Sequence, residues 1–377
     1  MVDSSGGDAR GLVRLDTSSR HRLDPGAGLD GHGVFSISPA LAACYGRRGD
    51  RVRRREFITL LGGLAPALPI NLRAARASGL AHIGFISGLD QSAARDFLNA
   101  LRDGLAALGY TEPSTLKLEE RFADYKPDRI PSLVQELEQL HVYIIVTHGA
   151  ATLPVATGQH RVPVVYELSA DPPSLGLAAD LAHPLHNATG ITLMSIEMNG
   201  KRLELLHEIA PQIARVAVIA NPLHSGMQLE RGDFEAKGKE LGIAVLFFST
   251  PNRAELDQAL NKLASESPQA LVAFSDAFIV DNRNYIINFA MSRRLPVISG
   301  WAVMAENGAL CTYGPRLVES YRRTAYFVDR ILKGSTPAEL PIERPTVFDL
   351  VVNLNSAKTL GITIPSTVLA RADRVIE

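Results

Sequence analysis

The sequence is poor in cysteine, which excludes a fold held together by disulfide bonds. It contains two cysteines, Cys44 and Cys311, in 377 residues. Only Cys311 would remain after removal of an N-terminal leader, and a single cysteine cannot form an internal disulfide. The folded part must therefore take its stability from buried apolar cores. Cys311 lies inside an apolar segment, which favours a packing role over a nucleophilic one.

An excess of positive charge is also missing. Residues 78–377 carry 27 Lys and Arg against 33 Asp and Glu, whereas residues 1–77 carry 12 against 7. The larger part of the chain is therefore net negative, which argues against nucleic acid as a partner. No apolar run after Ala77 is long enough to cross a bilayer as a helix.

Motifs for catalysis and for metal binding are absent as well. After Ala77 there is no Gly-x-Ser-x-Gly elbow, Walker loop or Gly-x-Gly-x-x-Gly fingerprint. His183 and His186, with His160 or His207, could suggest zinc, but the pair lies in a Pro-containing loop without the usual ligand spacing. We therefore expect no metal, no cofactor and no catalytic residue.

The N-terminal region has the order of an export signal. Arg54-Arg55-Glu56-Phe57-Ile58 has the Arg-Arg-x-Phe-apolar order of a twin-arginine signal. The apolar run 60–70 is too short, and too rich in Gly and Pro, to be a membrane anchor. We predict a signal peptide over 53–77, cleaved after Ala77, and hence a periplasmic protein exported by the twin-arginine or the general route. The other interpretation is an ordinary arginine-flanked start of a helix.

A leader precedes this signal. Residues 1–52 are rich in Gly, Ser, Asp and Arg and have no apolar period, so we expect them to be disordered. Signal peptides normally stand at the N-terminus. The simplest account is therefore that translation begins near Val52 and that the leader is not translated.

Short apolar runs alternate with amphipathic helical segments through the rest of the chain. The expected strands of the first series are 81–87, 116–122, 142–146 and 162–168. Those of a second series, which begins after Asn199, are 216–220, 243–248, 270–274 and 296–299. Alternating strands and helices predict an α/β fold with parallel sheets and right-handed crossovers. Two consecutive series predict two similar lobes, and the linker 187–200 is the first crossing between them.

The end of the chain is expected to return to the first lobe. A strand at 309–313 and an amphipathic helix at 321–332 precede a proline-rich connector at 336–345, and another strand follows at 347–354. We predict that lobe 1 comprises 78–193 plus 309–335. Lobe 2 would then comprise 194–308 plus 336–377.

Several stretches carry a family resemblance that covers nearly all of residues 53–377. They are Arg-Arg-Glu-Phe-Ile-Thr-Leu-Leu-Gly-Gly (54–63), Ala-Asp-Pro (170–172), Gly-Lys-Arg-Leu-Glu-Leu-Leu (200–206), Arg-Val-Ala-Val (215–218), Tyr-Gly-Pro (313–315), Arg-Ile-Leu-Lys-Gly (330–334) and the tail 360–373. In these the chain resembles the periplasmic substrate-binding proteins of ABC transporters, in the family that includes tryptophan- and tyrosine-binding receptors. The resemblance implies two Rossmann-like lobes joined by a three-crossing hinge, a fold like that of type I periplasmic binding proteins.

Two loops depart from the family pattern. Ser169-Ala170-Asp171-Pro172 stands where relatives often have Gly-Gly-Asp-Pro. The segment 184–190 reads Pro-Leu-His-Asn-Ala-Thr-Gly, where relatives have Pro-Gly-Gly-Asn-x-Thr-Gly. Both lie near the expected cleft, so the solute is expected to differ from that of relatives.

Ligands of open α/β sheets bind beyond the carboxyl ends of the strands, and this rule selects the candidate site. The first lobe would contribute Ser87, Gly88, Thr147, His148, Gly149 and the segment 167–171, in which Ser169 and Asp171 are candidates. The second lobe would contribute Asn221, Ser225, Asp276, Trp301 and, on the returning strand, Tyr313.

Each candidate role has a structural alternative. Amides near Ser87 and Gly149 suit a carboxylate, and Asp171 or Asp276 would suit an ammonium. Asp171 could equally shape a turn and Asp276 cap a helix. Trp301 and Tyr313 could stack on a solute, or pack in the core and at the hinge, and His148 could be a satisfied buried residue.

The resemblance implies a monomeric receptor of an ABC importer. It would capture an amino acid or related small carboxylate and deliver it to a membrane permease. One alternative is a secreted α/β enzyme that acts on a small polar substrate. Another is a ligand-sensing regulator, but residues 1–50 show no helix-turn-helix pattern.

Overall fold

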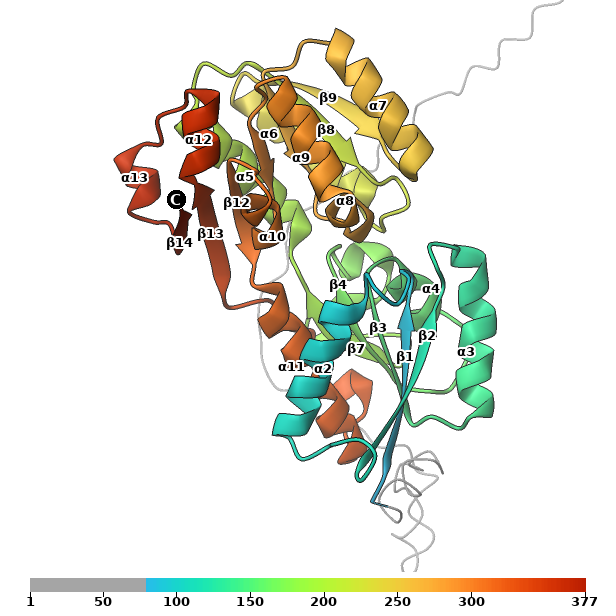
Figure 1. Ribbon diagram of the computed structural model, residues 1–377. Coiled ribbons are helices and arrows are strands. Elements are labelled where there is room, and N and C mark those ends of the chain that lie inside the picture. Colours follow the sequence, from blue (N-terminus) through green and yellow to red (C-terminus); the bar gives the residue numbers. More distant parts are fainter. Residues whose placement is uncertain (1–78) are drawn as a thin grey trace, which may run out of the picture. The chain divides into compact units, whose positions relative to one another are not determined.

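The computed structural model describes residues 79–377, so the predicted leader, signal peptide and cleavage site lie outside the described part (Figure 1). A five-stranded sheet organises the first lobe, in the order β2-β1-β3-β4-β7, with all neighbours parallel. Its strands are β1 (Ala81–Ser87), β2 (Leu116–Phe122), β3 (Ile144–His148), β4 (Val164–Leu168) and β7 (Ala188–Thr192).

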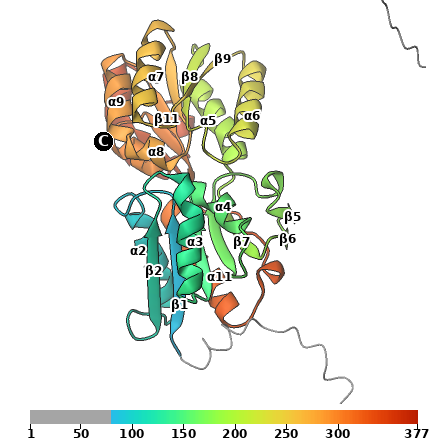
Figure 2. The same cartoon turned by 90° about the vertical axis from the view of Figure 1, so that its right-hand side faces the viewer.

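Helices cover both faces of this sheet, which is why its central strands are almost uninterrupted apolar runs. On one face lie α2 (Arg95–Ala107) and α11 (Leu317–Leu332). On the other lie α3 (Ile130–Gln139) and α4 (Thr152–Ala156), which Figure 2 shows in front. The remaining short elements are η2 (Pro127–Arg129), η3 (Gly149–Ala151), η4 (Pro173–Leu175), η5 (Pro337–Glu339) and the antiparallel pair β5 (Ala178–Asp180) and β6 (His183–Pro184).

A seven-stranded sheet organises the second lobe, in the order β14-β13-β12-β11-β10-β8-β9. Its strands are β8 (Arg215–Ala220), β9 (Ala244–Ser249), β10 (Ala270–Ala273), β11 (Val297–Ser299), β12 (Cys311–Pro315), β13 (Phe348–Asn353) and β14 (Arg374–Ile376). Only the β12–β13 pair is antiparallel. The expected α/β architecture of two lobes with largely parallel sheets is therefore confirmed.

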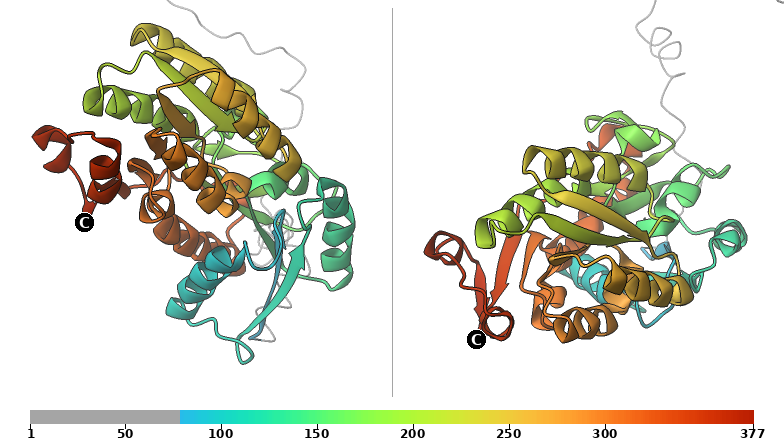
Figure 3. Two further views of the ribbon diagram at one scale, coloured as in Figure 1. Left: turned by 45° about the horizontal axis from the view of Figure 1, so that its top comes forward. Right: turned by 90° about the horizontal axis from the view of Figure 1, so that it is seen from above.

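The second sheet is also covered on both faces. One face packs against α5 (Ser195–Ile209), α6 (Met227–Glu240), α12 (Leu354–Leu360) and α13 (Ser366–Leu369). The other packs against α7 (Arg253–Ser265), α8 (Ala277–Asp281), α9 (Arg283–Ser292) and α10 (Ala302–Glu306). Figure 3 shows α12, α13 and the C-terminus together at the β14 edge. None of the helices within residues 79–377 has the length and hydropathy needed to cross a bilayer.

The chain passes between the lobes three times, as the expected hinge requires. The first crossing joins β7 to α5, the second joins β12 to α11, and the third joins η5 to β13. The first crossing was predicted as a linker over 187–200, but residues 188–192 form β7, an edge strand of the first sheet.

The predicted boundaries of the returning segment were wrong at both ends. The strand expected at 309–313 in lobe 1 is β12, which pairs with β11 and β13 in the second sheet. Its Cys311 is fully buried in the second core, as the sequence suggested. Conversely, the connector after α11 belongs to lobe 1, because Leu340 and Ile342 are buried there. The segment that returns to lobe 1 therefore begins after Pro315 and ends near residue 346.

A glycine allows the returning helix to pack closely on the first lobe. A Cβ atom at Gly104 of α2 would lie 2.5 Å from the carbonyl oxygen of Arg322 in α11. That oxygen belongs to the backbone and cannot rotate away, so a side chain here would push the two helices apart. Figure 1 shows α2 and α11 lying side by side.

We expect Gly104→Ala to lower the free energy of unfolding by about 1–3 kcal/mol because the new methyl group overpacks the α2–α11 contact. The matched control is Gly232→Ala in α6, where no atom lies within 4 Å of the new Cβ. That change should stabilise by about 0.5–1 kcal/mol because Ala is the better helix former. Denaturant unfolding of both variants measures the difference, and equal effects would contradict the close contact.

Candidate functional site

The carboxyl ends of three neighbouring strands in the first lobe bring polar side chains together. Ser87 ends β1, His148 ends β3, and Glu167 lies next to the end of β4; the strand register pairs them in sequence. Ser87 Oγ lies 2.9 Å from His148 Nε2 and also accepts a hydrogen bond from the Leu89 amide at 3.0 Å. Burial lowers the pKa of His148 to about 4, so its imidazole is neutral at pH 7.

Glu167 is the least compensated of these groups. Its side chain is buried, with 3% of the residue exposed, and burial raises its pKa to about 8. No hydrogen bond or ion pair within residues 79–377 opposes that rise, since burial is its sole cause. Glu167 lies in the predicted segment 167–171 without a predicted role, because burial of a carboxyl group is not visible in a sequence.

Two polar residues at the edge of the second sheet are bonded to each other. Asn221 Nδ2 donates to Asp276 Oδ1 at 3.1 Å. The same oxygen accepts the Phe278 amide at 2.9 Å, so Asp276 caps α8. The nearby Ser275 hydroxyl is buried without a hydrogen-bond partner in the described part of the chain. The capping role proposed for Asp276 is therefore present, whereas its contact with a ligand stays a prediction.

Among the described residues outside the hinge crossings, side chains of the two lobes are hydrogen-bonded to each other in two places. Ser169, after β4, is hydrogen-bonded to Nε2 of His224, in the loop after β8, and both residues are buried. Tyr125, after β2, donates a hydrogen bond to Asp281 at the end of α8, and this contact is exposed. These contacts hold the lobes together around the strand ends.

A buried polar network continues from His224 into the second lobe. His224 Nδ1 lies 3.4 Å from Glu230 Oε1, and Asn199 Nδ2 donates to Glu230 Oε2 at 2.8 Å. Arg202 donates to Asn199 Oδ1 and, through Nε, to the Tyr313 carbonyl oxygen at 2.7 Å. Burial raises the pKa of Glu230 and lowers that of Arg202 to about 10. The charges of Glu230 and Arg202 are each compensated by polar partners within this network.

Apart from Tyr313, the residues of this polar network were not predicted from the sequence, although one signal was present. Asn199 and Arg202 are three residues apart, so they lie on one face of α5. Arg202 belongs to the stretch 200–206 that carried the family resemblance, and it is only 1% exposed. An arginine among leucines in an amphipathic helix can be read as a surface residue, and only the tertiary structure shows it buried.

For the other predicted site residues, the structure shows a position but no contact that tests their role in binding a ligand. Gly88 follows β1, and Gly149 begins η3 with φ +57°. Ser225 lies in the loop after β8, and Trp301 is half-buried just before α10. Thr147 is buried on β3, and its hydroxyl has no partner among the described residues.

Tyr313 lies on β12 near the hinge. Its ring stacks on Phe348 of β13, with centroids 6.2 Å apart and an interplanar angle of 27°. The ring thus packs within the second lobe, while its carbonyl accepts the bond from Arg202. The hinge-packing alternative describes this arrangement, and contact with a solute stays a prediction.

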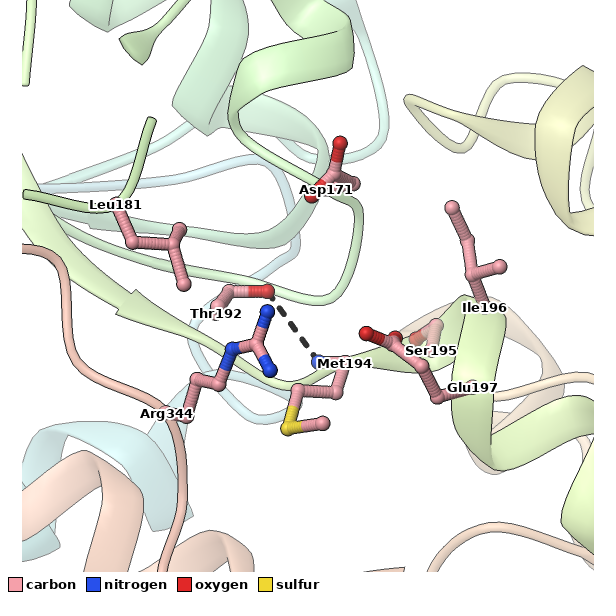
Figure 4. Close-up of a pocket in the computed structure, with 8 residues that line it drawn as sticks. All are labelled: Asp171, Leu181, Thr192, Met194, Ser195, Ile196, Glu197 and Arg344. Carbon is pink, nitrogen blue, oxygen red and sulfur yellow. Dashed lines mark hydrogen bonds between the residues drawn. The ribbon is translucent and has the colours of Figure 1, made fainter. Parts of the chain in front are cut away.

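A small pocket lies at the first hinge crossing (Figure 4). It is lined by Asp171, Leu181, Thr192, Met194, Ser195, Ile196, Glu197 and Arg344. Asp171 Oδ2 accepts the Ser174 amide at 3.0 Å, which is the turn-forming role considered for it. The Met194 amide donates to Thr192 Oγ1 at 3.3 Å, which is the bond drawn in Figure 4.

Three of the four histidines considered for zinc, His160, His183 and His186, have separate local partners. His183 Nδ1 lies 2.8 Å from Asp180 Oδ1, His186 Nε2 lies 3.0 Å from the Gly176 carbonyl, and His160 Nε2 lies 2.6 Å from the Val155 carbonyl. Within residues 79–377, no three His, Cys, Asp or Glu side chains form a group that could hold a metal ion.

Comparison with protein families matches residues 82–376 to the family described as ABC transporter substrate binding protein. The chain belongs to this family. The substrate-binding protein also has structural neighbours that span the same region. A search of curated proteins found no match.

One solved structure, a conserved domain protein from Vibrio cholerae, is 25% identical with a TM-score of 0.73 and covers 78% of this chain and 99% of its own. A second, an ABC domain in complex with L-Trp from Streptococcus pneumonia, is 22% identical with a TM-score of 0.72 and covers 79% and 100%. A third, a 5-methylthioribose transporter solute binding protein from Thermotoga lettingae, is 14% identical with a TM-score of 0.54 and covers 81% and 98%. These likenesses confirm the expected type I periplasmic-binding-protein-like fold.

We expect the substrate-binding protein to lose stability between pH 6.5 and 8 through Glu167. A carboxyl group whose pKa is raised from 4.5 to about 8 on folding keeps its proton in the folded state and loses it in the unfolded state. Stability therefore falls as pH rises, by about 1.4 kcal/mol per unit. Below pH 6.5 the lowered pKa of His148 acts in the opposite direction, so the two slopes offset each other.

Denaturant unfolding at pH 6.5 and pH 8 tests this expectation. In the wild type the free energy of unfolding should fall by about 2 kcal/mol across that interval, and Glu167→Gln should remove this fall. The matched control is Glu136→Gln, whose side chain is exposed and pairs with Arg121 at 2.7 Å. Parallel profiles for the wild type and Glu167→Gln would show that Glu167 does not keep its proton in the folded protein.

Proposed function

We propose that this substrate-binding protein is the solute receptor of an ABC importer. It captures an amino acid or related small carboxylate between its lobes and delivers it, as a periplasmic monomer, to a membrane permease. The observation that carries this proposal is the pair of lobes joined by three crossings, with the carboxyl ends of both sheets bridged by Ser169 and His224. The L-Trp complex of the streptococcal neighbour supports an amino acid as the solute class.

The mechanism is capture by closure of the lobes. In an open form, each lobe presents half of the site, and a solute that contacts both halves stabilises the closed form. The contacts Ser169–His224 and Tyr125–Asp281 exist only when the lobes are together, so they add to the stability of the closed form. The permease would then recognise the closed receptor.

A screen of amino acids and small organic acids by thermal shift tests the proposed function. A true solute at 100 times its dissociation constant should add about 2.7 kcal/mol to the free energy of unfolding, since it binds only the folded protein. The response should saturate, and the solute should be recovered unchanged after incubation. Chemical turnover of the compound would favour the secreted-enzyme alternative instead.

The interlobe contacts should differ in their effect on affinity. Ser169→Ala removes a buried bond, worth about 0.5–1.5 kcal/mol, and leaves His224 Nε2 without a partner. We expect the dissociation constant of the solute to rise by roughly 2- to 10-fold. Tyr125→Phe removes an exposed contact, so the rise should be smaller. Calorimetric titration of both variants measures the difference, and equal affinities for Ser169→Ala and the wild type would contradict a role for this bond in closure.

A further inference from the structure

A buried acid in the first lobe has no counter-charge in the described part of the chain. Glu167 lies next to the carboxyl end of β4, the edge of the sheet that faces the second lobe. It is 3% exposed, and no lysine, arginine or hydrogen-bond donor contributes to its ionisation. Burying a carboxyl group without a partner is unfavourable, and proteins normally pair such groups. A partner from outside the chain would remove this penalty.

The surroundings of Glu167 are aromatic. On the adjacent strand, the His148 ring stacks on Phe97 of α2, with centroids 4.5 Å apart. The Tyr321 ring of α11 lies 4.4 Å from the Phe97 ring. The charge of Glu167 acts on Tyr321, and burial raises the pKa of this phenol well above its usual value. Aromatic rings beside a carboxylate are a favourable environment for a cation.

Within residues 79–377, no cationic side chain contributes to the ionisation of Glu167. The titratable groups on the packed elements are His148 of β3, Asp96 of α2 and Tyr321 of α11. His148 is neutral at pH 7, while Asp96 is an acid that, like Glu167, opposes ionisation of Tyr321. The local charge balance therefore favours a positive group on a ligand.

The acids that the sequence suggested for an ammonium are less available. Asp276 Oδ1 already accepts from Asn221 and from the Phe278 amide. Asp171 Oδ2 accepts the Ser174 amide and lines the hinge pocket. Glu167 alone among these three acids has no bonded oxygen within residues 79–377.

We propose that Glu167, which pairs with His148 at the strand ends of the first lobe, is the subsite that receives a protonated amine of the solute. This inference rests on the proposed receptor function and narrows the solute to amine-bearing compounds such as amino acids. It also predicts proton release. The free protein holds Glu167 protonated below about pH 8, so an ammonium group must displace that proton to the buffer. Affinity should therefore rise up to about tenfold per pH unit between pH 6 and 8.

The test uses the purified full chain and matched pairs of probes that differ by one amino group. The pairs are L-tryptophan and indolepropionate, L-phenylalanine and phenylpropionate, and L-leucine and isocaproate. We expect saturable binding of amine-bearing members only. Glu167→Gln should raise the dissociation constant at least about 30-fold, the scale of truncating one partner of a buried charge pair. Glu136→Gln is the control and should bind as the wild type does.

Calorimetry in two buffers of different ionisation enthalpy gives a readout that needs no variant. The apparent binding enthalpy should differ between the buffers at pH 7 by close to one proton per solute bound, and this proton release should decrease as the pH rises toward 8 and above. That result would support the subsite even if Glu167→Gln folds poorly.

The outcomes separate the subsite from the receptor function. A probe that binds without an amine, or an amine whose affinity and proton release are unchanged in Glu167→Gln, overturns the subsite and leaves the receptor intact. If Asp171→Asn lost affinity for the amine-bearing probes and Glu167→Gln did not, the subsite would also be overturned, because Asp171 at the hinge would then hold the amine. No saturable binding by any probe, in the wild type at any pH, contradicts the amino-acid class on which the inference rests.

Discussion

The hydrogen bond between Ser169 and His224 is the contact on which the arrangement of the site depends. It joins the loop after β4 to the loop after β8, and both side chains are buried. Behind His224 lie Glu230, Asn199 and Arg202, each of which compensates the next. Because the charges in this polar network are buried, none of these side chains can move alone without leaving a buried group unpaired. The network therefore helps to hold His224 in place within the second lobe.

The packing of α11 against the first lobe, between two strands of the second sheet in chain order, creates two of the three hinge crossings. The chain leaves the second sheet after β12, packs α11 against α2, and returns through the connector that buries Leu340. The contact at Gly104 shows how closely this helix is held. Tyr321 reaches the carboxyl edge of the first sheet from α11, so the returning segment supplies part of the wall around Glu167 as well as a crossing.

The two lobes use their buried ionisable groups differently. In the second lobe, Arg202 and Glu230 are compensated within one network, so their role is to hold structure. In the first lobe, burial favours the neutral forms of Glu167 and His148, and of these two only His148 has a hydrogen-bonded partner in the described part of the chain, namely Ser87. An uncompensated acid at the edge where lobes close is suited to a ligand, whereas a compensated one is suited to a scaffold.

The sequence by itself determined the fold class, the two series of strands and helices, and the loops that follow the strands. It could do so because apolar periodicity and the carboxyl-end rule are local properties, and Ser87, His148, Ser169 and Asp276 were placed at or after strand ends in this way. Only the tertiary structure decided which sheet takes residues 311–315, that Arg202 is buried, and that Glu167 has no counter-charge among residues 79–377. These depend on burial and on partners distant in sequence, and a strand or a charged residue carries no local signal of either.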